Sequence, residues 1–219
     1  MAGASTSFPY TADGFSDGAY DPSIADALNV TEGMAGHKPP QGGTIAAGGT
    51  KLTNVITQSL ADSSITTTLT PSTGVAVATL MGFVKNQTIT NINLLSGTAS
   101  VTQTHLWAAI TTASGTVSGT VVAVTADGGT ASTTLNGVQT LALTTPWVVP
   151  TTGNYYVHVL CAASTVATWD AGTATAGLRS TIFPILAGTE GSGLTAPPAV
   201  GGTLSTALTV NKPLAIYCN

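Results

Sequence analysis

Residues 75–117 read VAVATLMGFVKNQTITNINLLSGTASVTQTHLWAAITTASGTV, and this stretch decides the fold class. Short runs rich in Val, Ile, Leu and Thr end at turn-forming pairs such as Asn86-Gln87 and Ser114-Gly115. Residues 135–164, LNGVQTLALTTPWVVPTTGNYYVHVLCAAS, have the same character and follow at the distance that a returning pair of strands needs. Because no helical periodicity interrupts either stretch, both predict antiparallel strands.

The same pattern covers most of the chain after Lys51. Apolar and β-branched runs alternate with turns such as Asp127-Gly128-Gly129 and Gly153-Asn154, which is typical of all-β sandwiches and barrels. Strands are predicted at residues 52–58, 75–84, 89–95, 102–110, 120–125, 138–143, 155–162, 177–186 and 204–217. We therefore predict an all-β domain at residues 51–219, an antiparallel β-sandwich with almost no helix.

Residues 1–50 differ from everything that follows them. They contain scattered prolines, glycine pairs and five carboxylates, and they lack periodicity apart from a short helix predicted around residues 22–30. They also hold four of the nine Phe and Tyr residues in the chain, although disordered segments are usually poor in aromatic residues. We expect an extended N-terminal arm that docks on a partner through Phe8, Tyr10, Phe15 and Tyr20.

The composition excludes several classes of function. Charged residues make up 6% of the 219 residues, and five Lys and Arg residues cannot neutralise a row of phosphates, so nucleic-acid binding through a basic stripe is excluded. The most apolar stretch, residues 75–84, is about half as long as a membrane span and fits a buried strand better. We expect a soluble protein without nucleic-acid or membrane partners, whose low charge suits packing against other proteins.

Residues that carry chemistry are few and scattered. His37, His105 and His158 occur singly, and together with Cys161 and Cys218 they do not show the ligand spacing of a structural zinc site. Two buried free thiols are expected, with a disulfide between neighbouring strands as the alternative. The sequence therefore predicts no catalytic residue, cofactor or metal site, and we expect that the protein is not an enzyme.

The histidines and carboxylates of the predicted sandwich each have a structural interpretation. His105 and His158 fall in the middle of predicted strands, which favours hydrogen-bonded or interface residues over a catalytic base. Asp127 lies in the turn ADGG, where Asp is expected for local reasons. Glu190 lies in residues 188–202, a long exposed loop that is either a solvated connector or a contact with a neighbour. Nothing in the spacing brings together the carboxylate pair that glycoside hydrolysis needs.

Residues 75–165 resemble the jelly-roll-like domain found in structural proteins of tailed bacteriophages, especially those of actinobacterial hosts. The resemblance covers less than half of the chain. The residues that carry it are the run Thr88-Ile89-Thr90-Asn91-Ile92, the strand Leu106-Trp107-Ala108 with its turn Ser114-Gly115, and the pattern Pro146, Pro150, Gly153, Tyr155-Tyr156.

The resemblance implies a jelly-roll-like sandwich in a virion structural protein, since the family includes head fibre, decoration and minor tail proteins. It also implies a homotrimer, exposed on the particle after assembly in the host cytoplasm. The short chain lacks a coiled-coil or collagen-like shaft, which favours a capsid decoration protein whose arm binds the major capsid protein or other virion proteins. The alternative is a minor tail or baseplate protein that binds host glycans through Trp107, Trp147 or Trp169.

Overall fold

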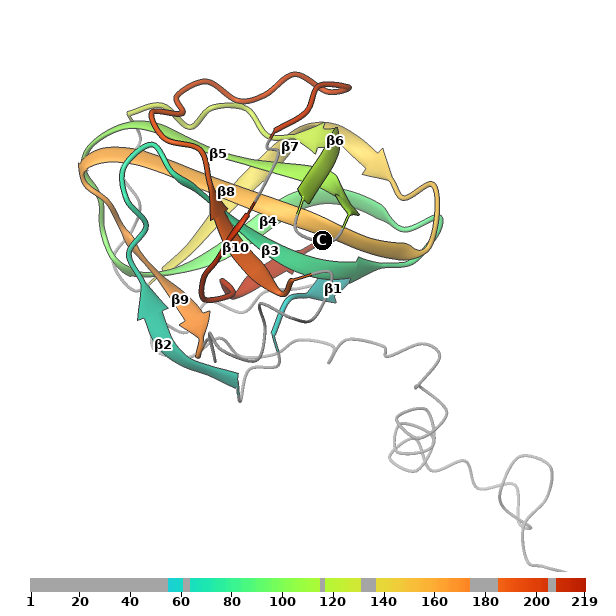
Figure 1. Cartoon of the computed structure of the whole chain (residues 1–219), viewed down its shortest axis with the longest axis horizontal. Coiled ribbons are helices and arrows are strands. Elements are labelled where there is room, and N and C mark those ends of the chain that lie inside the picture. Colours follow the sequence, from blue (N-terminus) through green and yellow to red (C-terminus); the bar gives the residue numbers. More distant parts are fainter. Residues whose placement is uncertain (1–54, 61–63, 115–116, 131–136, 174–184, 205–207) are drawn as a thin grey trace, which may run out of the picture. The chain divides into compact units, whose positions relative to one another are not determined.

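The structure is a computed structural model, and the residues that it describes are 55–60, 64–114, 117–130, 137–173, 185–204 and 208–219 (Figure 1). These residues form antiparallel strands with almost no helix. None of the helical structure among them is long and apolar enough to cross a membrane. The prediction of an all-β protein is confirmed, whereas the arm predicted at residues 1–50 lies outside the described residues.

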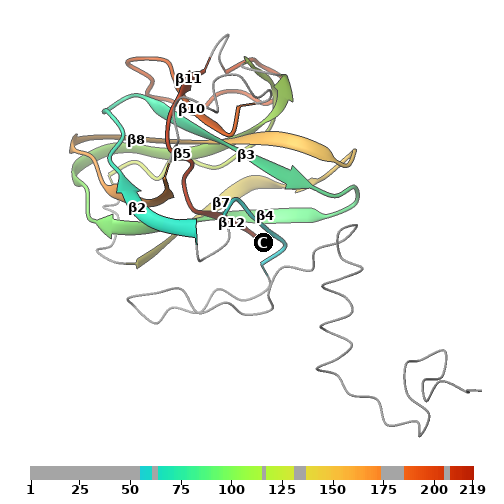
Figure 2. The same cartoon turned by 60° about the horizontal axis from the view of Figure 1, so that its bottom comes forward.

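The strands form two sheets that stack face to face (Figure 2). The first sheet has the strand order β1-β12-β4-β9-β2. Because residues 92–94 of β4 pair with both β12 and β7, these two strands flank β4 on opposite edges. The strands of this sheet are β1 (Thr57–Gln58), β2 (Ile65–Leu69), β4 (Thr88–Thr98), β7 (Gly137–Val148), β9 (Thr168–Gly172) and β12 (Ile216–Cys218).

The second sheet has the strand order β11-β10-β3-β8-β5-β6, and all its pairings are antiparallel. Its long central strands, together with β4 and β7 of the first sheet, explain why residues 75–117 and 135–164 dominate the sequence pattern. The strands are β3 (Ala76–Phe83), β5 (Val101–Ser114), β6 (Val117–Val124), β8 (Gly153–Thr165), β10 (Ala187–Glu190) and β11 (Thr209–Val210).

Side chains from the inner faces of both sheets form one apolar core. Ile92 of β4 in the first sheet and Val157 of β8 in the second are both fully buried in it. At one end of this core Trp147 makes edge-to-face contacts with Phe83 and Tyr155, with ring centroids 5.4 and 5.0 Å apart. Aromatic contacts between the two sheets fix how the sheets are stacked.

The outer face of the second sheet is also covered. Leu194 and Leu204 pack against the buried cluster around Trp107 and Leu160, and Leu208 packs on Tyr156. Covering this face buries both sides of β8, which is why its sequence is apolar almost throughout rather than alternating. Three leucines of the segment after β10 therefore pack on this sheet, whereas most of residues 191–203 are exposed.

Several strands differ from the sequence-based predictions. Strands β2, β9 and β10 are absent from those predictions, and each is only four or five residues long. The sequence of β2, ITTTL, does favour a strand, whereas TWDAG and AGTE contain Asp, Gly and Glu, which are depleted in strands. The predicted strand at residues 204–217 contains two short strands, β11 and β12, separated by Pro213, which lacks a backbone donor. Most of the predicted strand at residues 177–186 lies outside the described residues.

Cys161 of β8 and Cys218 of β12 are free and buried, which confirms the expectation of two structural thiols. Burial raises the pKa of both thiols, that of Cys218 to about 12. Because the thiolate is the reactive form, both should resist modification.

We expect neither thiol to react with Ellman's reagent at pH 8 in the folded protein, and both to react at once in denaturant. Parallel measurements with and without 6 M guanidinium chloride would check this. Rapid labelling of one thiol under native conditions would show that the core around that residue opens readily.

Candidate functional site

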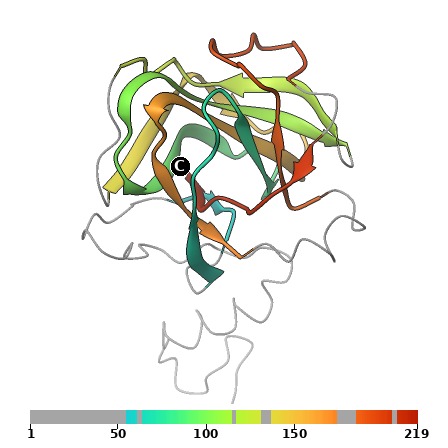
Figure 3. The ribbon, with the colours of Figure 1, turned by 60° about the vertical axis from the view of Figure 1, so that its left-hand side comes forward.

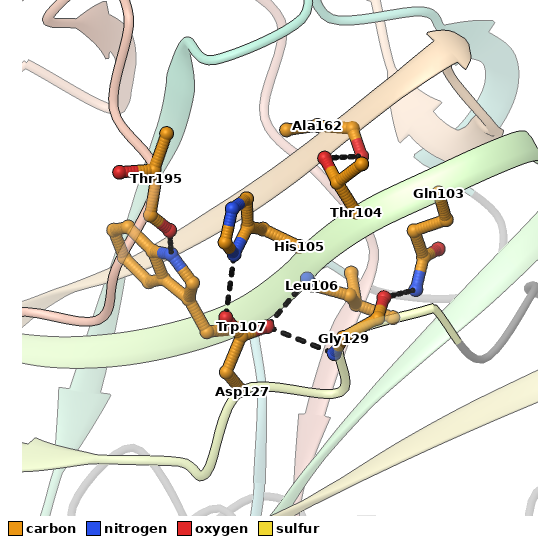
Figure 4. Close-up of polar contacts among 9 residues, drawn as sticks. All are labelled: Gln103, Thr104, His105, Leu106, Trp107, Asp127, Gly129, Ala162 and Thr195. Carbon is orange, nitrogen blue, oxygen red and sulfur yellow. Dashed lines mark hydrogen bonds and ion pairs between the residues drawn. The ribbon is translucent and has the colours of Figure 1, made fainter.

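His105 and Asp127 meet at the surface beside the first half of β5 (Figure 4). Nδ1 of His105 lies 2.6 Å from Oδ2 of Asp127, and the two side chains are 30% and 26% exposed. His105 belongs to β5, whereas Asp127 lies in the turn that follows β6. The pair therefore joins a strand to a turn, and both of its side chains are partly exposed.

The second carboxylate oxygen of Asp127 fastens the turn to β5. Oδ1 accepts hydrogen bonds from the backbone N–H groups of Leu106, at 3.1 Å, and Gly129, at 2.9 Å. Gly129 has a φ of +53°, which favours glycine, and its carbonyl accepts a hydrogen bond from Nε2 of the buried Gln103. These contacts give Asp127 the local, turn-stabilising role that its sequence context predicts.

A carboxylate on Nδ1 orients an imidazole as in serine hydrolases, but catalysis then requires a nucleophile at Nε2. Within the described parts of the chain, no hydroxyl or thiol forms a hydrogen bond with Nε2 of His105. The geometry of the pair is that of a clamp between β5 and the turn.

The charge of Asp127 should make the clamp sensitive to pH. Burial raises the pKa of Asp127, but hydrogen bonds from His105, Gly129 and Leu106 outweigh it and hold the pKa below the ordinary value of 3.8. A carboxyl whose pKa falls on folding stabilises the folded state above its unfolded-state pKa of about 4. That stabilisation is lost as the pH falls through the folded-state pKa.

We expect Asp127→Asn to lower the free energy of unfolding by up to about 1 kcal/mol at pH 7, since the pair is partly exposed. The deficit should shrink as the pH falls through the folded-state pKa of Asp127, because the wild-type carboxyl then also becomes neutral. Urea titrations of both proteins at pH 7 and pH 2.5 would measure it. A deficit of the same size at both values would mean that the charge contributes nothing.

The three tryptophans predicted as glycan contacts are all buried. Trp107 is fully buried, and its Nε1 donates a hydrogen bond to the carbonyl of Thr195 at 2.7 Å. Trp147 is 8% exposed within the aromatic contacts at the end of the core, and Trp169 is 1% exposed. Sugar rings stack on exposed faces of aromatic rings. These tryptophans offer no such face in this structure, because each fills a core position.

The second histidine is the centre of a buried polar cluster. Nε2 of His158 lies 2.9 Å from Oγ1 of Thr111, and Nδ1 lies 2.9 Å from Oε1 of Glu190. Nδ1 and Oε1 lie at ion-pair distance, although their alignment falls outside hydrogen-bond geometry. The other carboxylate oxygen accepts a hydrogen bond from Ser118 at 3.3 Å. Hydroxyl, imidazole and carboxylate thus follow one another in the order of a catalytic triad.

Burial shows that this cluster is structural. The side chains of His158 and Glu190 are both 0% exposed, and Thr111 is fully buried. Four strands contribute to it, namely β5, β6, β8 and β10. A substrate cannot reach the hydroxyl of Thr111, and the cluster instead holds β10 and β6 onto the central strands.

One of these residues, Glu190, is misjudged by the sequence pattern. Glu190 lies in the Gly-rich sequence GTEGSG and was expected in an exposed loop, but it is 3% exposed at the end of β10. His158 is structural, as expected, and fully buried. One sequence signal could have indicated that Glu190 pairs with His158. The chain has few charges, and a carboxylate buried among apolar strands needs a polar partner.

The remaining predicted site residues, Phe8, Tyr10, Phe15 and Tyr20, lie outside the described residues. Over the described ranges, His, Cys, Asp and Glu side chains form no group of three that could hold a metal ion. No family model matches the chain, and no curated protein matches it.

Proposed function

We propose that the sandwich is a jelly roll and that the chain is a non-enzymatic structural protein of a bacteriophage virion. The strand order carries the proposal. Counting β2 as the first strand, the first, eighth, third and sixth strands are neighbours in one sheet, as β2, β9, β4 and β7. The second, seventh, fourth and fifth are neighbours in the other, as β3, β8, β5 and β6. This order is the one expected for an eight-stranded jelly roll with two Greek keys, which supports the proposal.

The resemblance at residues 75–165 supports the phage assignment. This stretch contains β3 to β8, which are six consecutive strands of the proposed jelly roll. Among the roles in this family, we propose that of a capsid decoration protein.

The use of polar side chains supports a structural role. His105 and Asp127 stabilise a turn, and His158 and Glu190 hold strands together inside the domain. Five residues with charged side chains lie in the described ranges, namely Lys85, Asp127, Asp170, Glu190 and Lys212. A surface of neutral hydroxyl and small apolar groups suits contact with other proteins in an assembly.

Docking is assigned to the arm, with Phe8, Tyr10, Phe15 and Tyr20 as apolar anchors on the head surface. A homotrimer would strengthen this attachment, because three linked arms bind with a high effective concentration. The carboxylates of the arm would affect orientation and association rate more than affinity.

The test is cosedimentation of the purified chain with phage heads assembled without it. We expect saturable binding at a fixed ratio to the capsid protein, and loss of binding when residues 2–30 are deleted. Replacing the four aromatic anchors by Ala should also abolish binding, whereas the matched control Asp13→Asn, Asp17→Asn, Asp21→Asn and Asp26→Asn should retain it. Undiminished binding of the truncated chain would rule out docking by the arm, and no binding of the full chain would rule out decoration.

A further inference from the structure

The segment that follows β10 crosses the outer face of the second sheet (Figure 3). Glu190 ends β10 close to one edge of this sheet. At the other edge the backbone N–H of Val121, on β6, donates a hydrogen bond to the carbonyl of Gly202 at 2.8 Å. The chain is beside β10 again at β11, which pairs with it. We call residues 191–204 the covering segment, because two of its leucines pack on buried side chains of the sheet.

The buried pair that His158 forms with its carboxylate partner lies on this same outer face, between two apolar clusters. Along β8, His158 alternates with Tyr156 and Leu160, so the three side chains point to one face of the sheet. Leu160 belongs to the cluster on which Leu194 of the covering segment packs, and Tyr156 belongs to the cluster that contains Leu208. The chain after β10 thus packs on both sides of the pair, whose two side chains are 0% exposed.

Small side chains on β3 let the carboxylate reach the imidazole. Strand β3 lies between β10 and β8, and its Ala78 pairs with both Gly188 and His158. On the same face of β3, Ala76 pairs with Glu190. These two methyl groups leave room for Nδ1 of His158 and Oε1 of Glu190 to lie 2.9 Å apart. The pair therefore links β10 to the central strands across β3.

Among the described residues, no other charged side chain faces this pair. Strands β3, β6 and β11 and the covering segment contain no titratable residue. On β8, the ring centroid of Tyr156 lies 6.2 Å from that of His158, and burial raises the pKa of Tyr156 to about 12, so this phenol stays neutral below about pH 10. The other titratable side chains of β5 and β8 are His105, which contacts Asp127, and Tyr155 and Cys161, which lie in the core between the sheets.

The charge of the pair is balanced only while the two groups together hold one proton. With a second proton the pair is a buried cation, and without any proton it is a buried anion. The hydroxyl groups of Thr111 and Ser118 beside it carry no charge that would balance either state. A buried unbalanced charge is costly, and admitting water removes that cost.

We infer that His158 and Glu190 form a proton-operated latch. The latch keeps β10 and the covering segment on the sheet while the pair holds a single proton, and it releases them when a proton is added or lost. The inference goes beyond the proposed function and does not depend on it, because both groups and everything that they hold lie within the domain.

The proton balance of opening sets the pH range of the latch. A solvated histidine loses its proton above about pH 6.5, and a solvated glutamate gains one below about pH 4.3. Between these values the opened and closed states hold the same single proton, so opening does not depend on pH. Above this range opening releases a proton and becomes up to about tenfold easier per pH unit, until the closed pair also loses its proton. Below it opening takes up a proton and again becomes easier. The latch should be tightest near about pH 5.5.

The test is hydrogen exchange at the backbone N–H groups that fasten the covering segment, corrected for the intrinsic pH dependence of exchange. Leu194 donates to the carbonyl of Gly74 at 2.9 Å, and Gly201 donates to the carbonyl of Val121 at 2.8 Å. In the wild type we expect the protection of both groups to fall by at least about tenfold from pH 5.5 to pH 8.

Glu190→Gln should reverse the direction of this change. Without the carboxylate the closed state holds a neutral imidazole, and the opened state takes up a proton below about pH 6.5. Protection in this variant should therefore fall by about tenfold from pH 8 to pH 5.5. His105→Gln is the matched control, because it removes the partly exposed histidine of the same sheet and should keep the wild-type profile.

A wild-type protection that is constant from pH 5.5 to pH 8 would overturn the latch. The same direction of change in Glu190→Gln as in the wild type would overturn it too, and so would loss of the wild-type profile in His105→Gln. If Glu190→Gln does not fold, the wild-type profile and the His105→Gln control decide the question without it. None of these outcomes bears on binding to phage heads, so failure of the latch and failure of the proposed function are distinguishable.

Discussion

Replacing Glu190 by Ala is expected to lower the free energy of unfolding by about 3–5 kcal/mol. The substitution leaves the fully buried imidazole of His158 without its acidic partner and removes the acceptor of the hydrogen bond from Ser118. Breaking one side of a buried ion pair is costly because the remaining polar group loses its compensation but stays away from water. Denaturant titration at pH 7 would measure the loss.

A double-mutant cycle separates the pair from its surroundings. His158→Ala should cost a similar amount, and the double variant should lose clearly less than the sum of the two single losses. Asp127→Asn, at the partly exposed pair, provides the control with a loss of up to about 1 kcal/mol. Additive losses at His158 and Glu190 would mean that the two side chains do not stabilise each other.

Replacing Trp107 by Ala is expected to destabilise the protein by about 3–5 kcal/mol. The indole is fully buried between β5 and the segment after β10, and it carries the hydrogen bond to Thr195. Its removal leaves a cavity and releases one end of the loop at residues 195–201. Limited proteolysis should then cut within residues 191–204 much faster than in the wild type.

Trp107→Phe is the matched control, because it keeps an aromatic ring in the core and removes the indole donor. We expect a smaller loss, in which the missing hydrogen bond accounts for about 1 kcal/mol. Equal stability losses in the two variants would contradict a major packing role. Equal proteolysis rates in the wild type and in Trp107→Ala would contradict the anchoring of the loop.

The long central strands could be predicted from the sequence, because burial and β-propensity agree there. Strand β8, for example, lies within a run that is apolar on both faces, and its turn at Gly153-Asn154 is explicit. The short strands β2, β9 and β10 could not be predicted, since their hydrogen bonds come from partners far along the chain. Ile65 of β2 pairs with Gly172 of β9, and Glu190 of β10 pairs with Ala76 of β3.

The polar clusters were only partly predictable for the same reason. Asp127 could be assigned a turn role because its partners Leu106 and Gly129 are backbone groups, one of them local. The environment of Glu190 depends on β6 and β8 lying across the sheet, which no local pattern encodes. The burial of the tryptophans could not be predicted either. An aromatic residue in a strand fits the core and a ligand-binding surface equally well, and only the segment that covers the strand decides between them.

Cryo-electron microscopy of particles that carry this chain tests its proposed role in decorating phage heads most directly. We predict density for the two-sheet domain at regular positions on the capsid lattice, with additional density for residues 1–50 along the shell. Density confined to the tail tip, or a lattice without this domain, would contradict the account.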